Sequence, residues 1–289
     1  MIGKVLNLLN RFIRKSYWYN NIIFADCEKF WNQTEFGLDI VNLGSTSARS
    51  AFNYAGTELK AKNWAMSPQT FVGDLEILRN YSCYLKENAT VIIPICPFSC
   101  LGGYNLDLPD KYYTILNIAS FPHASFIRRQ NILKIKSNPI SAYPLVQLVS
   151  RKKKSACNDF SKDAITRMDA WKHEFSIMRW EYPLSIVNKD AYNDSAIILT
   201  EIIDYCKSHN FRPVVVLPPV SNELNSLFTQ EMKKLFITDF VQKASKTVLF
   251  LNYMDSPEFR DSALYENSFL LNAKGGNLFT QRILKDIAL

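Results

Sequence analysis

Apolar runs and helix-spaced apolar positions alternate along most of the chain. Runs of consecutive apolar residues are typical of strands that are covered on both faces of a parallel sheet, and the clearest such run is Thr90 to Cys96. Between these runs, apolar residues recur every three or four positions, which indicates helices. The expected strands are 39–43, 58–65, 90–96, 213–217 and 248–253, and the expected helices are 48–54, 69–86, 158–177, 191–209, 224–243 and 275–285.

This alternation predicts an α/β fold with three layers, in which a mostly parallel five-stranded sheet has helices on both faces. The region from about 101 to 185 breaks the alternation with Pro and Gly signals, clustered aromatic residues and the basic run Arg151 to Lys154. We interpret it as an insertion after the third strand of one α/β domain, 38–289, which follows a lead-in of residues 1–37. In such sheets, sites form outside the carboxyl ends of the strands.

Residues 1–15 predict an amphipathic helix, because Val5, Leu8 and Phe12 recur at helical spacing among basic residues. Polar residues interrupt the apolar stretch and no small-residue cleavage site follows, so the segment fits neither a signal peptide nor a membrane span. Two placements stay open. The helix packs on the domain, or it makes a weak contact with an anionic membrane surface.

Charge and cysteine usage limit the partners and the compartment. The 289 residues carry a net charge of +7, which favours an acidic partner, but no nucleic-acid motif surrounds the basic run and we expect no nucleic-acid partner. Six cysteines at irregular spacings indicate reduced thiols in a cytoplasmic protein, at most peripheral to the inner membrane. Cys96 and Cys100 could hold a metal only if other ligands converged, so we expect neither a metal nor a cofactor.

Two short blocks carry a resemblance to a known family. Asn42-Leu-Gly-Ser-Thr46 resembles the first block of SGNH/GDSL hydrolases, in which a Gly-Asp-Ser or Gly-Ser-Ser turn presents the nucleophile. Residues 267–275 (Asn-Ser-Phe-Leu-Leu-Asn-Ala-Lys-Gly) resemble the late block, Asp-x-x-His followed by Leu-Asn-x-x-Gly. Through Tyr265 to Asn272 the chain is also similar to SGNH-like proteins found among bacterial capsule and O-antigen polysaccharide genes. The resemblance spans about residues 38 to 288 and implies an SGNH-hydrolase or flavodoxin-like sheet.

Departures from the family pattern affect every catalytic position. The resemblance places Thr46 at the nucleophilic serine and Ser45 at the Asp of Gly-Asp-Ser. It places Asn267 at the acid and Leu270 at the histidine, and the oxyanion-hole positions, Ser99 among them, are changed as well. Leucine cannot accept a proton, and the loss of one triad member costs several orders of magnitude in rate. We therefore expect a catalytically degenerate protein with a hydrolase-like fold.

A polar set remains at the predicted edge of the sheet. The candidate catalytic positions are Ser45, Thr46 and Asn267, and the candidate binding residues are Asn42, Gln69, Ser99, Asn222 and Asn272. Hydroxyls and amides can hydrogen-bond sugar hydroxyls, and aromatic side chains could supply packing faces. The alternative is that each of these groups caps a helix or closes a turn, and both interpretations stay open.

Three functions are consistent with these patterns. The first is a degenerate SGNH-like protein that serves surface-polysaccharide biosynthesis by binding a glycan or an acylated sugar. The second is an active esterase, carbohydrate O-acetyltransferase or deacetylase that uses Ser45 or Thr46 with a base from elsewhere, His123 or Asp255. The third is a peripheral membrane interaction protein whose basic N-terminal helix is the functional part.

Overall fold

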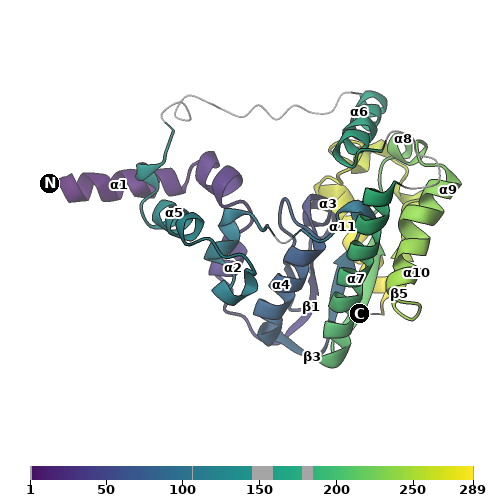
Figure 1. Ribbon diagram of the computed structural model, residues 1–289, viewed down its shortest axis with the longest axis horizontal. Coiled ribbons are helices and arrows are strands. Elements are labelled where there is room, and N and C mark those ends of the chain that lie inside the picture. Colours follow the sequence, from purple (N-terminus) through teal and green to yellow (C-terminus); the bar gives the residue numbers. More distant parts are fainter. Residues whose placement is uncertain (1, 106, 145–158, 178–184, 289) are drawn as a thin grey trace. The chain divides into compact units, whose positions relative to one another are not determined.

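The computed structural model describes residues 2–105, 107–144, 159–177 and 185–288 (Figure 1). The chain forms two compact units, of which one consists of Met1–Thr34 with Leu106–Ser155 and the other of Glu35–Asn105 with Ala156–Leu289. The N-terminal segment therefore groups with part of the region that the sequence analysis describes as an insertion. The basic run Arg151 to Lys154 lies outside the described residues.

The larger unit contains a five-stranded sheet in which every pairing is parallel. The strands are β1 (Leu38–Asn42), β2 (Ala61–Asn63), β3 (Leu85–Pro94), β4 (Arg212–Leu217) and β5 (Leu249–Asn252), in the order β2-β1-β3-β4-β5. The predicted α/β class is confirmed. Because β1 lies between β2 and β3, the strand order reverses direction between β1 and β3, and doubly wound sheets bind ligands at this switch point.

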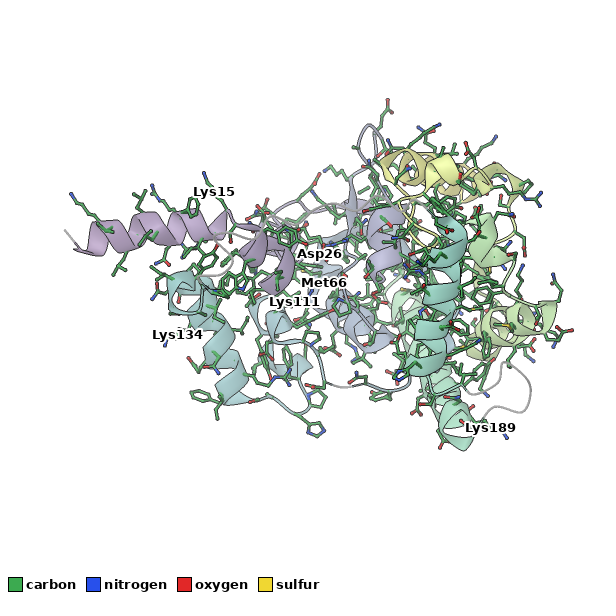
Figure 2. The ribbon with its side chains drawn as sticks, turned by 90° about the horizontal axis from the view of Figure 1, so that it is seen from above. Lys15, Asp26, Met66, Lys111, Lys134 and Lys189 are labelled. Carbon is green, nitrogen blue, oxygen red and sulfur yellow. The ribbon has the colours of Figure 1, made fainter. Side chains whose placement is uncertain are left out.

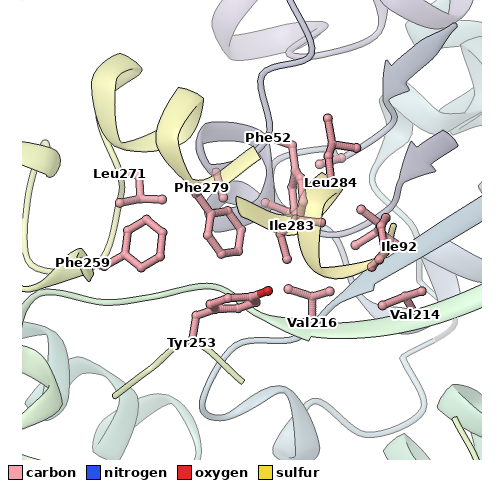
Figure 3. Close-up of a cluster of buried hydrophobic side chains, with 14 of the residues drawn as sticks. Phe52, Ile92, Val214, Val216, Tyr253, Phe259, Leu271, Phe279, Ile283 and Leu284 are labelled. Carbon is pink, nitrogen blue, oxygen red and sulfur yellow. The ribbon is translucent and has the colours of Figure 1, made fainter. Parts of the chain in front are cut away.

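One face of the sheet is covered by α3 (Thr46–Ala51) and α11 (Ala273–Asp286). Every second residue of the central strands points toward these helices, as Ile92 and Val214 do (Figure 3). Phe279 of α11 lies at the centre, with ring centroids 5.5 Å from Phe52 and 5.2 Å from Tyr253. Burial of these large apolar side chains is the main stabilising term for this layer.

The opposite layer contains α4 (Phe71–Tyr81) and α7 (Ile186–Ser208), which contact each other and run side by side in Figure 1. α7 buries Ile198, Leu199 and Ile202. The sheet is thus covered on both faces, as the consecutive apolar residues in its strands predict. The other elements of this unit are α6 (Phe160–Glu174), α8 (Asn222–Asn225), α9 (Gln230–Lys233), a π-helical turn (Lys234–Asp239) and α10 (Phe240–Ala244).

The structure corrects two predicted helices. The first begins at Thr46 and not at Ala48, so the predicted turn over 44–47 ends at Ser45. Gly44 makes this early start possible, because its φ of +106° suits glycine and a Cβ there would lie 2.7 Å from the Cβ of Ala48. The helix predicted over 224–243 is instead broken, because Thr229 caps a new helix by accepting a hydrogen bond from the N–H of Met232 at 3.2 Å.

The smaller unit packs α1 (Ile2–Arg14), α2 (Glu28–Trp31) and α5 (Phe126–Ser137) with short turns. Its interior includes Phe24 and the buried Lys111, whose ammonium group donates to the carbonyl of Ala25 at 3.1 Å. None of the helices in the described part of the chain is both long enough and apolar enough to cross a membrane.

Candidate binding site at the switch point of the sheet

A cavity of about 580 Å³ opens at the carboxyl ends of β1 and β3, within the larger unit. Its floor is the turn after β1 and the end of β3, and its walls come from the loop before α4, from α6 and from the late loop before α11. The cavity therefore occupies the position at which doubly wound sheets bind ligands. Its polar lining residues are Ser45, Thr46, Ser47, Gln69, Thr70, Asp74, Cys96, Ser99, Asn105 and Glu174.

Hydrogen bonds join the turn after β1 to the loop before α4. The hydroxyl of Ser45 accepts from the backbone N–H of Gln69 at 3.1 Å, and the hydroxyls of Thr46 and Ser67 lie 2.7 Å apart. Ser45 is the N-cap residue of α3, yet its side chain does not cap that helix. The predicted grouping of Ser45, Thr46 and Gln69 at one edge of the sheet is therefore correct, and the two hydroxyls hold loops together.

Asp74 is the most unusual polar residue of the cavity, because it is a carboxyl that is only 3% exposed. It accepts hydrogen bonds from the backbone N–H of Gly44 at 2.7 Å and from the side-chain amide of Gln69. Burial raises the pKa of Asp74 to about 7, although these two hydrogen bonds act in the opposite direction. The side chain can thus exchange a proton near neutral pH.

Ser99 closes the turn after β3. Its hydroxyl accepts from the backbone N–H of Cys96 at 2.8 Å and lies 3.2 Å from the Cys96 sulfur. Burial raises the pKa of the Cys96 thiol, so the thiol stays protonated near neutral pH. Ser99 lines the cavity as predicted, with its hydroxyl already engaged by its own turn.

Aromatic rings form part of the cavity wall. Trp171 of α6 lies edge-on to Phe98 and to Phe269, with centroid distances of 5.1 Å and 5.3 Å, and Phe175 lies 6.1 Å from Phe98. All four rings line the cavity. A set of rings together with hydroxyl and amide groups is suited to a ligand that has both apolar faces and polar edges, such as a sugar ring.

The late loop is held by contacts of Ser268, Tyr265 and Asp163. The backbone N–H and the hydroxyl of Ser268 both donate to the Asp163 carboxylate of α6, at 3.0 Å and 2.5 Å. The Tyr265 hydroxyl donates to the carbonyls of Val220 and Phe259. These contacts place the next residue, Phe269, in the cavity wall.

Asn267, Leu270 and Asn272 have structural roles in this loop. The Asn267 amide oxygen accepts from the N–H groups of Phe269 and Leu270, both at 3.0 Å, which closes a local turn. Asn272 caps α11 by accepting from the N–H of Gly275 at 3.0 Å. Within the described chain, none of the three lines the cavity. The family's loop path would turn Asn267 and Leu270 toward Thr46, but in this structure Phe269 is the residue of the loop that lines the cavity.

Two further candidates lie outside the cavity lining. Asn42 is fully buried in β1, where its amide nitrogen donates to the Leu43 carbonyl at 3.0 Å and to the Asn63 side chain at 2.9 Å. Asn222 is exposed at the start of α8. Asn42 thus links β1 to β2, and neither residue contributes a group to the cavity surface that the structure describes.

Neither of the two bases suggested by the sequence is among the described residues that line the cavity. Asp255 accepts from Lys233 at 2.6 Å and from Asn225 at 2.9 Å. Burial alone would raise the pKa of Asp255, but these two hydrogen bonds act in the opposite direction and the pKa is lowered overall. His123 is exposed and belongs to the smaller unit. His209 ends α7, where its ring Nδ1 lies 2.8 Å from the Tyr205 carbonyl oxygen and caps the helix.

Sequence reasoning missed Asp74, Glu174 and Trp171. Asp74 lies in the first turn of a helix, where an acidic residue is common and gives no functional signal. Glu174 and Trp171 belong to a region whose pattern does not reveal its partners. In the portions of the chain that the structure describes, no group of three or more His, Cys, Asp or Glu side chains could hold a metal ion.

Comparison with known proteins adds no identity to this geometry: no family model and no curated protein matches the chain.

Proposed function

We propose that the chain is an SGNH-hydrolase-like protein that binds a glycan or an acylated sugar in this cavity and does not cleave it. The observation that carries the proposal is the composition of the cavity. The lining combines hydroxyl groups of the turn after β1, the amide of Gln69 and aromatic rings that include Trp171. Sugar rings present apolar C–H faces and hydroxyl edges, which match the two kinds of lining group.

The hydrogen-bond partner of Thr46 and the lack of a histidine in the described cavity lining support binding without hydrolysis. A serine or threonine hydroxyl becomes a nucleophile when a neighbouring base removes its proton. No histidine of the described chain lines the cavity, and the Thr46 hydroxyl is paired with another hydroxyl, that of Ser67. A hydroxyl is not a base at neutral pH, so the group that the Thr46 hydroxyl contacts cannot accept its proton as the histidine of a serine hydrolase does.

Surface-polysaccharide biosynthesis is the setting that the resemblance implies, and it supplies the class of ligand. Polysaccharides of this kind carry free hydroxyls and O-acetyl groups. Aromatic rings like those of the cavity wall can pack against a sugar ring or an acetyl methyl group. The proposed role is therefore recognition of such a sugar.

A glycan array carrying O-acetylated and de-acetylated oligosaccharides from bacterial capsules and O-antigens tests the proposal. We expect selective binding and recovery of the bound sugar with its acetyl groups intact. Thr46→Val should weaken binding, because it removes a hydroxyl at nearly constant volume, whereas Thr166→Val on exposed α6 surface should not. Binding to no sugar, or release of acetate, contradicts the proposal.

A second candidate function rests on Asp74. Its pKa of about 7 gives it the proton affinity of a general base, and it lines the same cavity as Ser45 and Thr46. An esterase or sugar O-acetyltransferase that uses this carboxylate would lose its activity in Asp74→Asn. That variant, assayed for acetate release from an O-acetylated oligosaccharide, separates the second candidate from the first.

A further inference from the structure

Helix α1 packs in its unit through Asn10 and Ile13 and exposes most of its other apolar side chains. Asn10 is buried, where its amide nitrogen donates to the Asn138 oxygen at 2.8 Å and its amide oxygen accepts from the N–H of Ile140 at 3.0 Å. Leu8 and Phe12 are 68% and 63% exposed. A single exposed leucine is ordinary, but an apolar helix face turned to solvent while an asparagine is buried indicates a function for that face.

Helix geometry gathers the exposed apolar side chains on one side. Each residue turns about 100° around the helix axis, which places Leu8 and Phe12 together with Val5 and Leu9 on one arc. All four are exposed, and the side that carries Asn10 is turned away from them. Val5, Leu8, Leu9 and Phe12 thus form an apolar face on which each side chain is at least 42% exposed.

Basic side chains border the apolar face. By the same geometry, Lys4 and Arg11 lie along its edge, and the exposed Lys15 continues that edge just beyond the helix (Figure 2). Arg14 is on the docked side, where it donates to the carbonyl of Ser137 at 2.5 Å. An apolar arc with a basic border is typical of helices that lie in the plane of a membrane interface.

The charge of the whole chain is concentrated in the unit that contains α1. That unit has 14 Lys and Arg against 4 Asp and Glu, and the larger unit has 20 against 23. The net charge of +7 therefore arises from the smaller unit, which opposes the pairing of two copies through this face and favours an anionic surface.

We propose that α1 lies in the interface of an anionic lipid bilayer, with its apolar face in the acyl boundary and Lys4, Arg11 and Lys15 among the headgroups. The hydrogen bonds of Asn10 fix the rotation of α1 so that this face stays outward. The contact is independent of any ligand in the cavity of the larger unit.

Vesicle flotation of the full chain tests this contact, using phosphatidylcholine vesicles with and without phosphatidylglycerol. The wild type should float with the anionic vesicles, and less so at high salt. The double variant Leu8→Ser with Phe12→Ser should weaken vesicle binding more than about tenfold, because it removes two apolar side chains that the proposal places in the acyl boundary. Lys4→Gln and Arg11→Gln should each weaken it about fivefold.

The matched control is Phe126→Ser with Ile127→Ser, which removes two side chains of the same unit that are 73% and 70% exposed. Their neighbour Arg128 forms ion pairs with Asp107 and Asp110, which leaves Arg129 as the basic residue directly beside this pair, and the control should still float. Equal losses in both double variants, or no flotation of the folded wild type, overturn the proposal. The proposal is also overturned if light scattering shows that the wild type is a dimer, that Leu8→Ser with Phe12→Ser dissociates this dimer, and that the wild type does not bind vesicles.

Discussion

The carboxylate of Asp74 accepts a hydrogen bond from the backbone N–H of Gly44 at 2.7 Å, which ties α4 to the turn after β1. Gly44 has a φ of +106°, and Ser45 and Thr46 follow directly. The contact therefore fixes the path of the chain at the point where the cavity begins. An acid of this kind couples the shape of the site to pH, because its protonation changes the strength of the bond.

The stability of the fold should depend on pH through Asp74. The pKa of Asp74 in the folded chain is raised to about 7 from an ordinary value of 3.8. Between about pH 4 and pH 7 the folded chain therefore keeps a proton on Asp74 that the unfolded chain has lost. Stability should therefore fall as pH rises from about 4 to about 7 and then level off, by at most about 4 kcal/mol. Urea unfolding of the wild type and Asp74→Asn at pH 5 and pH 8 measures this.

In Asp74→Asn this fall with pH should disappear, because an amide does not titrate and its oxygen can still accept from Gly44. The free energy of unfolding of the variant minus that of the wild type should therefore be larger at pH 8 than at pH 5. If both proteins lose the same stability between the two pH values, the burial of Asp74 does not control the pH response.

Ester hydrolysis should be negligible. Short-chain nitrophenyl esters test it directly, because they need little recognition and report on the nucleophile and base alone. The variant Thr46→Ser with Asn267→Asp and Leu270→His should stay inactive, since Phe269 and not Leu270 lines the cavity. Turnover by the wild type that disappears in Ser45→Ala or Thr46→Ala would show that the site is catalytic.

Gly275, near the start of α11, should tolerate no side chain. A Cβ on Gly275 would lie 2.1 Å from the carbonyl oxygen of Leu264, so Gly275→Ala should lower the free energy of unfolding by roughly 1–3 kcal/mol. At Gly102 the nearest atom to a new Cβ is 3.5 Å away, and Gly102→Ala is the control. Equal stabilities of the two variants in urea unfolding would contradict the close packing of α11.

The cap of α11 provides a separate test of the late loop. Asn272→Ala should cost about 1–2 kcal/mol, because the N–H of Gly275 loses its acceptor and the Ala263 carbonyl loses a donor at 2.8 Å. The exposed Asn222 is the control, since Asn222→Ala should change stability by only a few tenths of a kcal/mol. A similar loss in the two variants would mean that Asn272 has no special role as a cap.

The sheet was predictable because its signal is local. Ile92, Ile93 and Val215 belong to runs of consecutive apolar residues, and a strand buried on both faces is the simplest structure that accommodates such runs. The position of the cavity followed from the same pattern, since loops at the carboxyl ends of parallel strands meet at one edge.

The content of the cavity was only partly predictable. Ser45 and Thr46 were found because a Gly-Ser turn ends a strand. Trp171 and Phe269 were not, because their contact depends on the bond between Asp163 and Ser268, which are 105 residues apart in the sequence. Sequence patterns report the spacing of residues within one helix or strand, so they do not reveal contacts between residues this far apart in the chain.

Calorimetric titration of the oligosaccharide selected on the array tests the central claim, sugar binding in the cavity. Trp171→Ala removes a ring from the aromatic wall, and Asn222→Ala changes an exposed amide outside the cavity lining. With both variants confirmed as folded, Trp171→Ala should bind at least about fivefold more weakly than the wild type, since stacking on an aromatic ring contributes on the order of 1 kcal/mol or more. Asn222→Ala should bind as the wild type does. Unchanged affinity in Trp171→Ala would contradict the assignment of the cavity as the sugar site.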